Sequence, residues 1–562
     1  MIRAARALTI TLLAAALLSL PTSGPVFAQV GNVLSFVKHS NTQGTFTAPL
    51  LNGDEVGGAA AGLGDLDGPG PSTHAVAVGA ALDDDGGTDK GAVYILFLNS
   101  AGSILSHTKI SATQGGLAGP IDALDEFGGA IAFLGDLDGP GPSAGAIAVG
   151  VPGDDDGGTD KGAVYILFLS STGTVLSQQK ISATAGGFTG VLDPLDVFGS
   201  SVAWLGDLDR YGESVAALAV GAIGDDDGGT DCGAVWILFL ESSGQVRSHQ
   251  KISRTAGGFT GVLDPFDEFG SALASLQDLD GSGPSTCALA VGAVFDDDGS
   301  LDRGAVWVLF LSRTGTVLSH QKISSTAGGL TVALDDLDEF GGSLANAGDM
   351  DAGGPGVTTL VVGAVGDDDG GGDRGAIYLL HLTASGFVSS SSKISKTAGN
   401  FTAVLDNFDN FGSSVAFLGD LNGAAVGGVT LVVGTIGDDD GGTDRGAIYV
   451  LTLSGNPTVD VPGPSVGVLG TGLSPVRPNP CFGRARIPFR IAESADVGIE
   501  IHDVTGRVVR HYQRPQLAAG THDVEWDGRD DGGRLLPAGA YFVGLRVGGR
   551  VIPPTLRTVL VR

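Results

Sequence analysis

The sequence predicts an all-β protein, with a six-bladed β-propeller followed by a small Ig-like β-sandwich. Three observations lead to this prediction. A unit with a period of 71 recurs six times, the apolar runs inside each unit are short and bounded by turn residues, and the composition changes after residue 456. Fixed-period repeats of short strands are typical of propellers. A seven-bladed ring is the alternative to six blades.

Three features of the repeat advance along the chain by the same constant step. D-L-D-like triplets begin at Asp65, Asp136, Asp207, Asp278, Asp349 and Asp420. Triple aspartates open at Asp83, Asp154, Asp225, Asp296, Asp367 and Asp438. An F-G pair stands at Phe127, Phe198, Phe269, Phe340 and Phe411, with Val56-Gly57 at that place in the first unit. The constant step identifies the units as copies of one structural element.

Each unit contains four strand-like segments. In the second copy they are 130–134, 146–149, 163–169 and 174–181, which are rich in Val, Ile, Leu and aromatic residues and are flanked by Gly, Asp or Ser. Runs of four to eight such residues between turn signals are typical of strands. Four antiparallel strands per unit match one propeller blade, although an open β-solenoid is also built from strand repeats.

The two ends of the repeat region favour a closed ring. Residues 31–35 resemble the start of a fourth strand, because they stand one period before 102–106. At the other end, Asn456-Pro457 follows the third strand of the sixth unit. Proline has no N–H for a central ladder, so no fourth strand is expected there. We therefore expect the first strand to complete the last blade, in a propeller that spans residues 29–456.

The segment 1–28 is typical of an export signal. Arg3 and Arg6 precede an apolar run over 7–20, and the small-residue pattern at 26–28 resembles a cleavage site. Pro21 ends the apolar run below the roughly 20 residues that a membrane span needs. We expect this segment to be a cleaved signal peptide, and the protein to be secreted or held on the outer surface of a bacterium.

Composition and charge narrow the classes of partner. Glycine accounts for 94 of the 562 residues, and the formal net charge is −32. A negative charge of this size excludes nucleic acid as the main partner. Three cysteines exclude a disulfide-stapled small fold. H-E-x-x-H, G-x-S-x-G and phosphate-loop patterns are absent from the sequence, so it offers no catalytic motif.

The repeat resembles a known family. The segment 127–139, which reads FGGAIAFLGDLDG, and the segment 148–152, which reads AVGVP, are similar to the FG-GAP repeat. That family includes the propeller of integrin α-subunits and many bacterial surface proteins. The resemblance implies a calcium-stabilised propeller used for binding and adhesion, in some proteins as an accessory to an enzyme domain.

The triple-aspartate loop is the main candidate for binding calcium. In the second copy, carboxylates at i, i+2 and i+6 surround two glycines, a spacing with which a loop wraps oxygens around Ca²⁺. The alternative is an acidic turn held by the basic residue that follows it in five copies and by fourth-strand lysines such as Lys180. The candidate ligands are Asp83, Asp85, Asp89, Asp154, Asp156, Asp160, Asp225, Asp227, Asp231, Asp296, Asp298, Asp302, Asp367, Asp369, Asp373, Asp438, Asp440 and Asp444.

The D-L-D loop is a weaker calcium candidate. It supplies the first two acids of the family's metal loop, but neither the third nor the last ligand place carries an acid in any copy. Because Ca²⁺ takes six to eight oxygens, two carboxylates make a poor cage. The weaker candidates are Asp65, Asp67, Asp136, Asp138, Asp207, Asp209, Asp278 and Asp280.

A second module follows the repeats. Residues 457–476 have a Gly/Pro linker composition, and short strand-like runs with glycine turns resume over 477–562. The sequences IHDVTGR at 501–507, GTHDVEWDG at 520–528 and PAGAYF at 537–542 resemble FlgD-like Ig domains and type IX secretion sorting domains. This resemblance implies an attachment module that outer-membrane export machinery recognises. Trp526 is expected to anchor its core.

Together these features predict a secreted or cell-surface binding and adhesion protein, and not an enzyme. Its ligand would be an extracellular glycan or protein. A structural spacer without a specific ligand is the alternative, because the blades are nearly identical. A polysaccharide-acting enzyme is the least favoured interpretation, since paired carboxylates abound but recur identically around the ring.

Overall fold

The computed structural model describes residues 30–455, apart from 69, 140–141, 210–213, 282, 351–356 and 422–427. It also describes residues 472–561, apart from 474–480, 483–484, 492–493, 504–506, 518–519, 538 and 549. All regular elements in these ranges are strands. The predicted signal peptide and most of the predicted linker lie outside the described residues.

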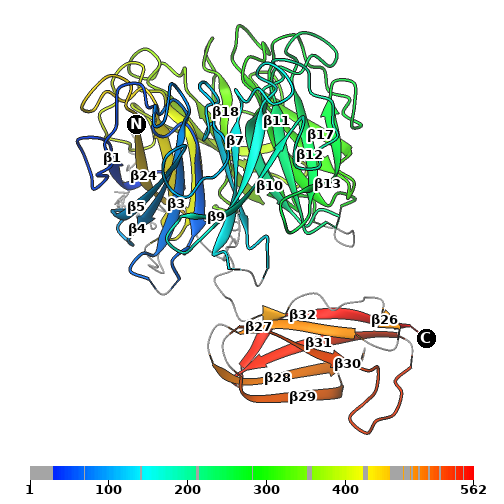
Figure 1. Cartoon of the computed structure of the whole chain (residues 1–562). Coiled ribbons are helices and arrows are strands. Elements are labelled where there is room, and N and C mark those ends of the chain that lie inside the picture. Colours follow the sequence, from blue (N-terminus) through cyan, green and yellow to red (C-terminus); the bar gives the residue numbers. More distant parts are fainter. Residues whose placement is uncertain are drawn as a thin grey trace, which may run out of the picture.

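The repeat region forms six four-stranded antiparallel sheets within the described residues (Figure 1). The six-bladed prediction is therefore confirmed, and the seven-bladed alternative is wrong. The strands of the first five sheets are β2 (Ala60–Gly64), β3 (His74–Ala80), β4 (Ala92–Leu98) and β5 (Ile104–Ser111); β6 (Ala130–Gly135), β7 (Gly145–Val151), β8 (Ala163–Leu169) and β9 (Val175–Ser182); β10 (Phe198–Gly206), β11 (Ala216–Ala222), β12 (Ala234–Leu240) and β13 (Val246–Ser253); β14 (Phe269–Gln277), β15 (Cys287–Ala293), β16 (Ala305–Leu311) and β17 (Val317–Ser324); β18 (Phe340–Asn346), β19 (Thr358–Ala364), β20 (Ala376–Leu382) and β21 (Val388–Ser395).

The sixth sheet joins the two ends of the repeat region. Its strands are β22 (Phe411–Gly419), β23 (Gly428–Thr435), β24 (Ala447–Ser454) and β1 (Val33–His39), and β1 pairs antiparallel with β24. The Ser454 amide donates to the Asn32 carbonyl at 2.7 Å, which extends the ladder to the end of the strand. The chain's first strand therefore supplies the fourth strand of its last blade.

The core lies between neighbouring blades. Each of six clusters of buried apolar residues combines side chains from two adjacent sheets, and one of them joins the sixth sheet to the first. Every residue of β8 is buried, because both faces of this strand contact a neighbouring blade. Both faces of each sheet are covered only when the ring is closed.

The glycine of each F-G pair has a packing role. Gly199 has a φ of +103°, and a Cβ at this position would lie 2.3 Å from the carbonyl oxygen of Ala163 in the preceding blade. Only glycine allows this backbone conformation together with so close an approach between blades. The repeated F-G pair is therefore explained by the geometry of the blade interface.

Residues 472–561 form two further sheets. One contains β25 (Gly472–Leu473), β27 (Ala485–Ile491) and β30 (Gly520–Trp526), and the other contains β26 (Cys481–Phe482), β32 (Arg550–Val561), β31 (Gly539–Val547), β28 (Ala495–His502) and β29 (Val508–Leu517). Trp526 is fully buried in the core of this module, and its indole N–H donates to the Arg529 carbonyl at 3.1 Å. The predicted role of Trp526 is confirmed.

Deletion of residues 30–39, which include β1, should destabilise the whole propeller. The sixth sheet would lose its outer strand, and Val33 would leave the core between the fifth and sixth blades. We expect a lower melting temperature by circular dichroism, with aggregation as the extreme result. A chain that lacks residues 477–562 is the control and should keep the propeller transition. Equal melting of the β1 deletion and the full chain would contradict the closure argument.

Candidate functional site

The triple-aspartate loop connects the second and third strands of each blade and is closed by its own side chains. In the second blade, Asp154 Oδ1 accepts from the Asp156 amide at 3.0 Å, and Asp155 Oδ1 accepts from the Asp160 amide at 3.0 Å. The same two hydrogen bonds occur in all six copies. The acids therefore cap backbone N–H groups of the turn, as Asp does in Asx turns.

A lysine from the fourth strand lies between the first and third aspartates of the loop. Lys180 Nζ is 2.5 Å from Asp154 Oδ2 and 2.8 Å from Asp156 Oδ2. The ladder places Lys180 directly opposite Tyr165, and its ammonium lies 5.7 Å from the centre of that ring. The same pairing holds in every blade and involves Lys38, Lys109, Lys180, Lys251, Lys322 and Lys393.

Burial and ion pairing have opposite effects on the pKa values of the two aspartates and of the lysine. Burial dominates at Asp154 and raises its pKa, although Lys180 opposes the shift. At Asp156 burial is outweighed by hydrogen bonds from Lys180 and Ser182, so the pKa is lowered. Burial alone would lower the pKa of Lys180, but its two carboxylate partners raise it above the ordinary value. The lysine is therefore charged and acts as an internal counter-ion.

The loop as described does not fit Ca²⁺. Asp154 and Asp156 are brought together, but an ammonium group lies where a cation would bind them. Asp160 adopts a left-handed φ of 44°, a conformation that Asp tolerates better than most residues, so the turn itself explains this residue. Among the described residues, no group of three or more His, Cys, Asp or Glu is arranged to hold a metal. Calcium binding stays a prediction, and this donor set does not support it.

In four blades, a serine contacts the second acid of the weaker D-L-D loop. Ser72 Oγ donates to Asp67 at 2.5 Å, and the equivalent serines donate to Asp138, Asp209 and Asp280. The pKa of Asp65 is raised to about 6 by burial and by its neighbour Asp67. The third ligand place of this loop lies outside the described residues in every copy. The serine hydroxyl holds the loop closed through a hydrogen bond to the second aspartate.

Sequence reasoning missed a further set of buried acids, one in each repeat. Asp125, in the segment between β5 and β6, is 4% exposed, and its Oδ2 accepts a hydrogen bond from the Asp122 amide at 2.7 Å. Burial is the main cause that raises the pKa to about 6 at Asp54, Asp125 and Asp196 and to about 7 at Asp267, Asp338 and Asp409. The recurrence of these acids at the period of the repeat was a signal available in the sequence.

In five blades a basic residue follows the acidic loop, and it reaches the next segment of chain and not its own acids. Lys161 Nζ donates to the Leu192 carbonyl at 2.5 Å, and Arg303 pairs with Asp336 at 2.9 Å. The predicted role of these residues as partners of their own turn is not what the geometry shows. The predicted role of the fourth-strand lysines as ion-pair partners is confirmed.

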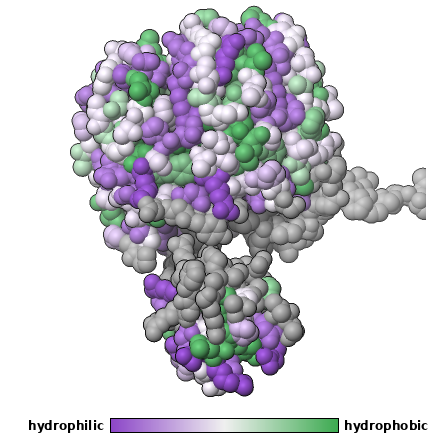
Figure 2. Space-filling model, turned by 90° about the vertical axis from the view of Figure 1, so that its right-hand side faces the viewer, coloured by the Kyte–Doolittle hydropathy of each residue, from purple (hydrophilic) through white to green (hydrophobic). Residues whose placement is uncertain are grey.

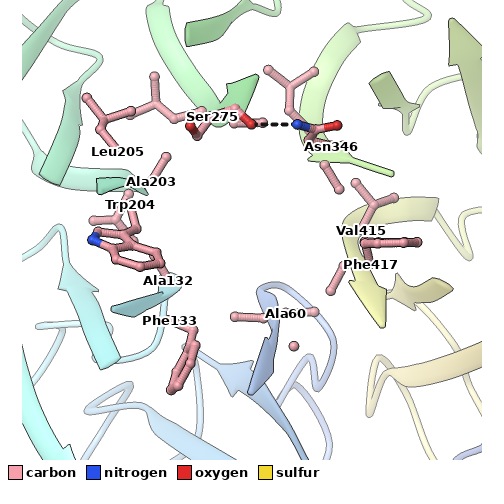
Figure 3. Close-up of a pocket in the computed structure, with 18 of the residues that line it drawn as sticks. Ala60, Ala132, Phe133, Ala203, Trp204, Leu205, Ser275, Asn346, Val415 and Phe417 are labelled. Atoms are coloured by element: carbon pink, nitrogen blue, oxygen red, sulfur yellow. Dashed lines mark hydrogen bonds between the residues drawn. The ribbon is translucent and has the colours of Figure 1, made fainter. Parts of the chain in front are cut away.

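The six innermost strands of the blades surround a central cavity of about 390 Å³ (Figure 3). One lining position is alanine in every blade, as Ala61, Ala132, Ala203, Ala274, Ala345 and Ala416. The next position differs from blade to blade, as Gly62, Phe133, Trp204, Ser275, Asn346 and Phe417. The residues that line this cavity therefore differ between blades, whereas the acidic loops are nearly the same in all six.

Fold and loops together define an all-β propeller with a C-terminal Ig-like module. Residues 481–547 match the family model of the FlgD Ig-like domain. No curated protein matches the sequence.

Among solved structures, similarity is found to PorZ, an essential bacterial surface component of the type IX secretion system of Porphyromonas gingivalis. The identity is 15% and the TM-score 0.35, over 90% of this chain and 51% of PorZ, so the chain spans about half the length of PorZ. FlgD of P. aeruginosa matches 14% of this chain and 60% of its own, at 28% identity and TM-score 0.12. A fungal AA5-family alcohol oxidase in complex with copper matches 92% of this chain and 99% of its own, at 12% identity and TM-score 0.33.

Replacing Lys180 with Met should destabilise the propeller strongly. The substitution keeps the apolar stem but leaves Asp154 and Asp156 without their counter-ion, and breaking a buried ion pair costs about 3 kcal/mol. Urea unfolding followed by fluorescence measures the change in the free energy of unfolding. Lys161→Met is the matched control and should cost about 1 kcal/mol, the value of a single hydrogen bond. Equal effects of the two substitutions would contradict the counter-ion role.

Removal of calcium should leave the melting temperature unchanged. A ligand that binds only the folded chain raises its stability, but a lysine already lies between the first and third aspartates of each loop. We expect melting curves in excess EDTA and in millimolar Ca²⁺ to coincide. A reproducible rise with Ca²⁺ would instead support the calcium prediction made from the repeat.

The propeller should be more stable in mild acid than in mild alkali. The folded pKa of Asp125 and its equivalents lies above the value in the unfolded chain, so the folded state binds protons more tightly between the two values. The contribution of these acids to the free energy of unfolding therefore increases as pH falls through about 7 to about 6, while histidines such as His39 and His74, whose pKa is lowered by burial, contribute in the opposite direction. We expect a higher melting temperature at about pH 5.5 than at about pH 8.

Asp267→Asn tests the assignment of this pH dependence. The amide keeps an acceptor for the Asp264 amide but cannot ionise, so the difference between the two pH values should shrink. A wild-type chain that is more stable at the higher pH would contradict the prediction.

Proposed function

We propose that this protein is exported to the bacterial surface, where the propeller binds an extracellular partner and the C-terminal Ig-like module serves for attachment or export. The observation that carries the proposal is a set of exposed apolar side chains beside the acidic loops. We call it the apolar ring, and it consists of Leu124, Leu195, Phe266, Leu337 and Phe408.

The fold gives no reason for large apolar residues at the positions of the apolar ring. Their φ angles lie between 69° and 73°, in the left-handed region that disfavours such side chains, and their exposed fractions lie between 49% and 62%. The first repeat has Gly53 at this place and makes the same backbone hydrogen bond as the other copies. A partner that covers these side chains would gain apolar burial that the isolated chain does not have.

The charge around the apolar ring points to a basic protein as partner. The Leu195 amide donates to the carbonyl of Thr159, a residue of the acidic loop, at 3.0 Å, so this member of the apolar ring lies against the loop. The middle aspartate of each loop, such as Asp155, is exposed. Figure 2 shows hydrophilic and hydrophobic residues interspersed over one side of the propeller. Apolar anchors among acids suit a surface with basic and apolar side chains.

The C-terminal module supports the second half of the proposal. The FlgD Ig-like match covers most of the described part of this module, and it accords with an attachment domain for outer-membrane export machinery. No helix in the described ranges is long and apolar enough to cross a membrane. The FG-GAP resemblance of the repeats stays a prediction and accords with an adhesive propeller.

The double substitution Phe266→Gly and Phe408→Gly should remove binding without unfolding the protein. Glycine relieves the left-handed conformation, so the melting temperature should stay the same or rise. Binding is measured on arrays of extracellular glycans and of basic and acidic matrix proteins. We expect the wild type to bind basic proteins, more weakly at high salt, and the double variant to lose at least about tenfold in affinity, since two buried aromatic anchors carry more than the roughly 1.4 kcal/mol that tenfold requires.

Leu318→Ala is the matched control, because Leu318 is similarly exposed but lies on the outer strand β17. It should bind like the wild type. Absence of any wild-type binding, or equal binding by the double variant, would contradict the proposed function.

A further inference from the structure

The central cavity is the second unusual feature of the propeller and is separate from the acidic loops. Within the described residues, β2, β6, β10, β14, β18 and β22 are each the edge strand of their sheet, and they line the cavity together. Its volume of about 390 Å³ falls in the range of roughly 300–1,000 Å³ that is usual for small-molecule sites.

Gln277 is the strongest sign of a role beyond the fold. It lines the cavity and has a φ of 55°, whereas the five equivalent positions are Gly64, Gly135, Gly206, Gly348 and Gly419, all with positive φ. Glycine takes this conformation without the strain that a side chain adds. Gln277 is exposed, so burial of its side chain does not compensate for the strain. One blade therefore keeps an amide group in a place where five blades keep none.

Polar and aromatic groups meet on one arc of the cavity. Trp204 presents its indole ring on one wall, and Ser275 and Asn346 lie on the adjacent wall, where Asn346 Nδ2 donates to the Ser275 carbonyl at 3.0 Å (Figure 3). Asn346 Oδ1 accepts from the Gly348 amide and from Thr358 Oγ1, which holds its amide in place. The remaining N–H of Asn346 is the donor that this orientation leaves for a ligand.

The opposite arc is built from small and apolar groups. Ala60, Gly62 and Ala132 line this side together with Phe133, which packs into the core between the first and second blades. Of the described residues that line the cavity, none carries a charge. A charged ligand would lose its hydration without gaining a counter-ion, so the cavity favours a neutral one.

From this arrangement we infer that the central cavity binds a neutral sugar, with Trp204 against the apolar face of the ring and Gln277 and Asn346 as partners for its hydroxyl groups. A sugar ring has one apolar face and an edge of hydroxyls, each of which donates and accepts. The cavity supplies an aromatic surface, two side-chain amides and the backbone N–H and C=O groups of edge strands. This site lies apart from the apolar ring, so the inference does not depend on the proposed function.

The volume of the cavity limits the length of the ligand. It suits one or two sugar residues, either as a free saccharide or as the end of a longer chain. Both sources present the same ring to the same residues.

Calorimetric titration with a panel of neutral saccharides tests the inference. The panel contains glucose, galactose, mannose, xylose, cellobiose, maltose and lactose, with glucuronate as the charged comparison. We expect saturable binding of at least one neutral sugar by the full chain and none of glucuronate. Retention on an insoluble polysaccharide that the free disaccharide competes away would indicate a chain end as the ligand.

Gln277→Gly is the decisive variant, because it restores the residue that five blades already carry. Its melting temperature should equal or exceed that of the wild type, while sugar affinity falls at least tenfold. Trp204→Phe should weaken binding as well. Gln245→Ala, on an exposed turn between β12 and β13, is the control and should bind like the wild type.

Three results would overturn the inference. They are the absence of binding for every neutral sugar, tighter binding of glucuronate, and unchanged affinity in both Gln277→Gly and Trp204→Phe. Failure here with retained binding by the apolar ring would leave the proposed function standing, and the converse result would contradict only the proposed function.

Discussion

Each blade of this protein has two apolar faces, and the burial of both is the constraint on which the structure depends. Strands such as β8 have no solvent-facing side, so a single sheet cannot be stable in water. Six blade interfaces, each with its own core cluster, cover both faces of every sheet only if the first and last sheets meet. Pairing of β1 with β24 completes the sixth blade and joins the two ends of the repeat region in one sheet.

Each blade also repeats the same ion pairs between aspartates and a lysine. Two aspartates of each acidic loop lie within reach of the same lysine ammonium and would repel one another if they had no counter-ion. A lysine one strand further along supplies that charge, so the two facing carboxylates of each loop share a counter-ion from the chain itself. In the sixth blade the lysine is Lys38, from the chain's first strand, which couples ring closure to charge balance.

Symmetry and its violations separate the structural positions from those with a binding role. The acidic loops, the lysines and the inter-blade glycines recur in all six copies, as expected for parts that every blade needs. The apolar ring recurs in five copies although neither its backbone conformation nor its exposure favours it. The lining of the central cavity differs from blade to blade, and Gln277 departs from glycine in one blade alone. The proposals for binding rest on these last two features.

The repeat period and the strand patterning, which are local properties of the chain, predicted four strands in each blade, closure by the N-terminal strand and the role of Trp526. They favoured six blades but left seven open, and the six sheets of the folded chain decide between the two. The Asp–Lys pairing was predictable as one of two alternatives, since the lysines recur in register with the loops. The position of Lys180 between Asp154 and Asp156 became clear from the fold alone, because this contact depends on how the hairpin of β8 and β9 brings the lysine back beside the loop. The fold also decided that Trp204, Ser275 and Asn346 share one cavity, because residues one period apart meet only when the strands surround a common axis.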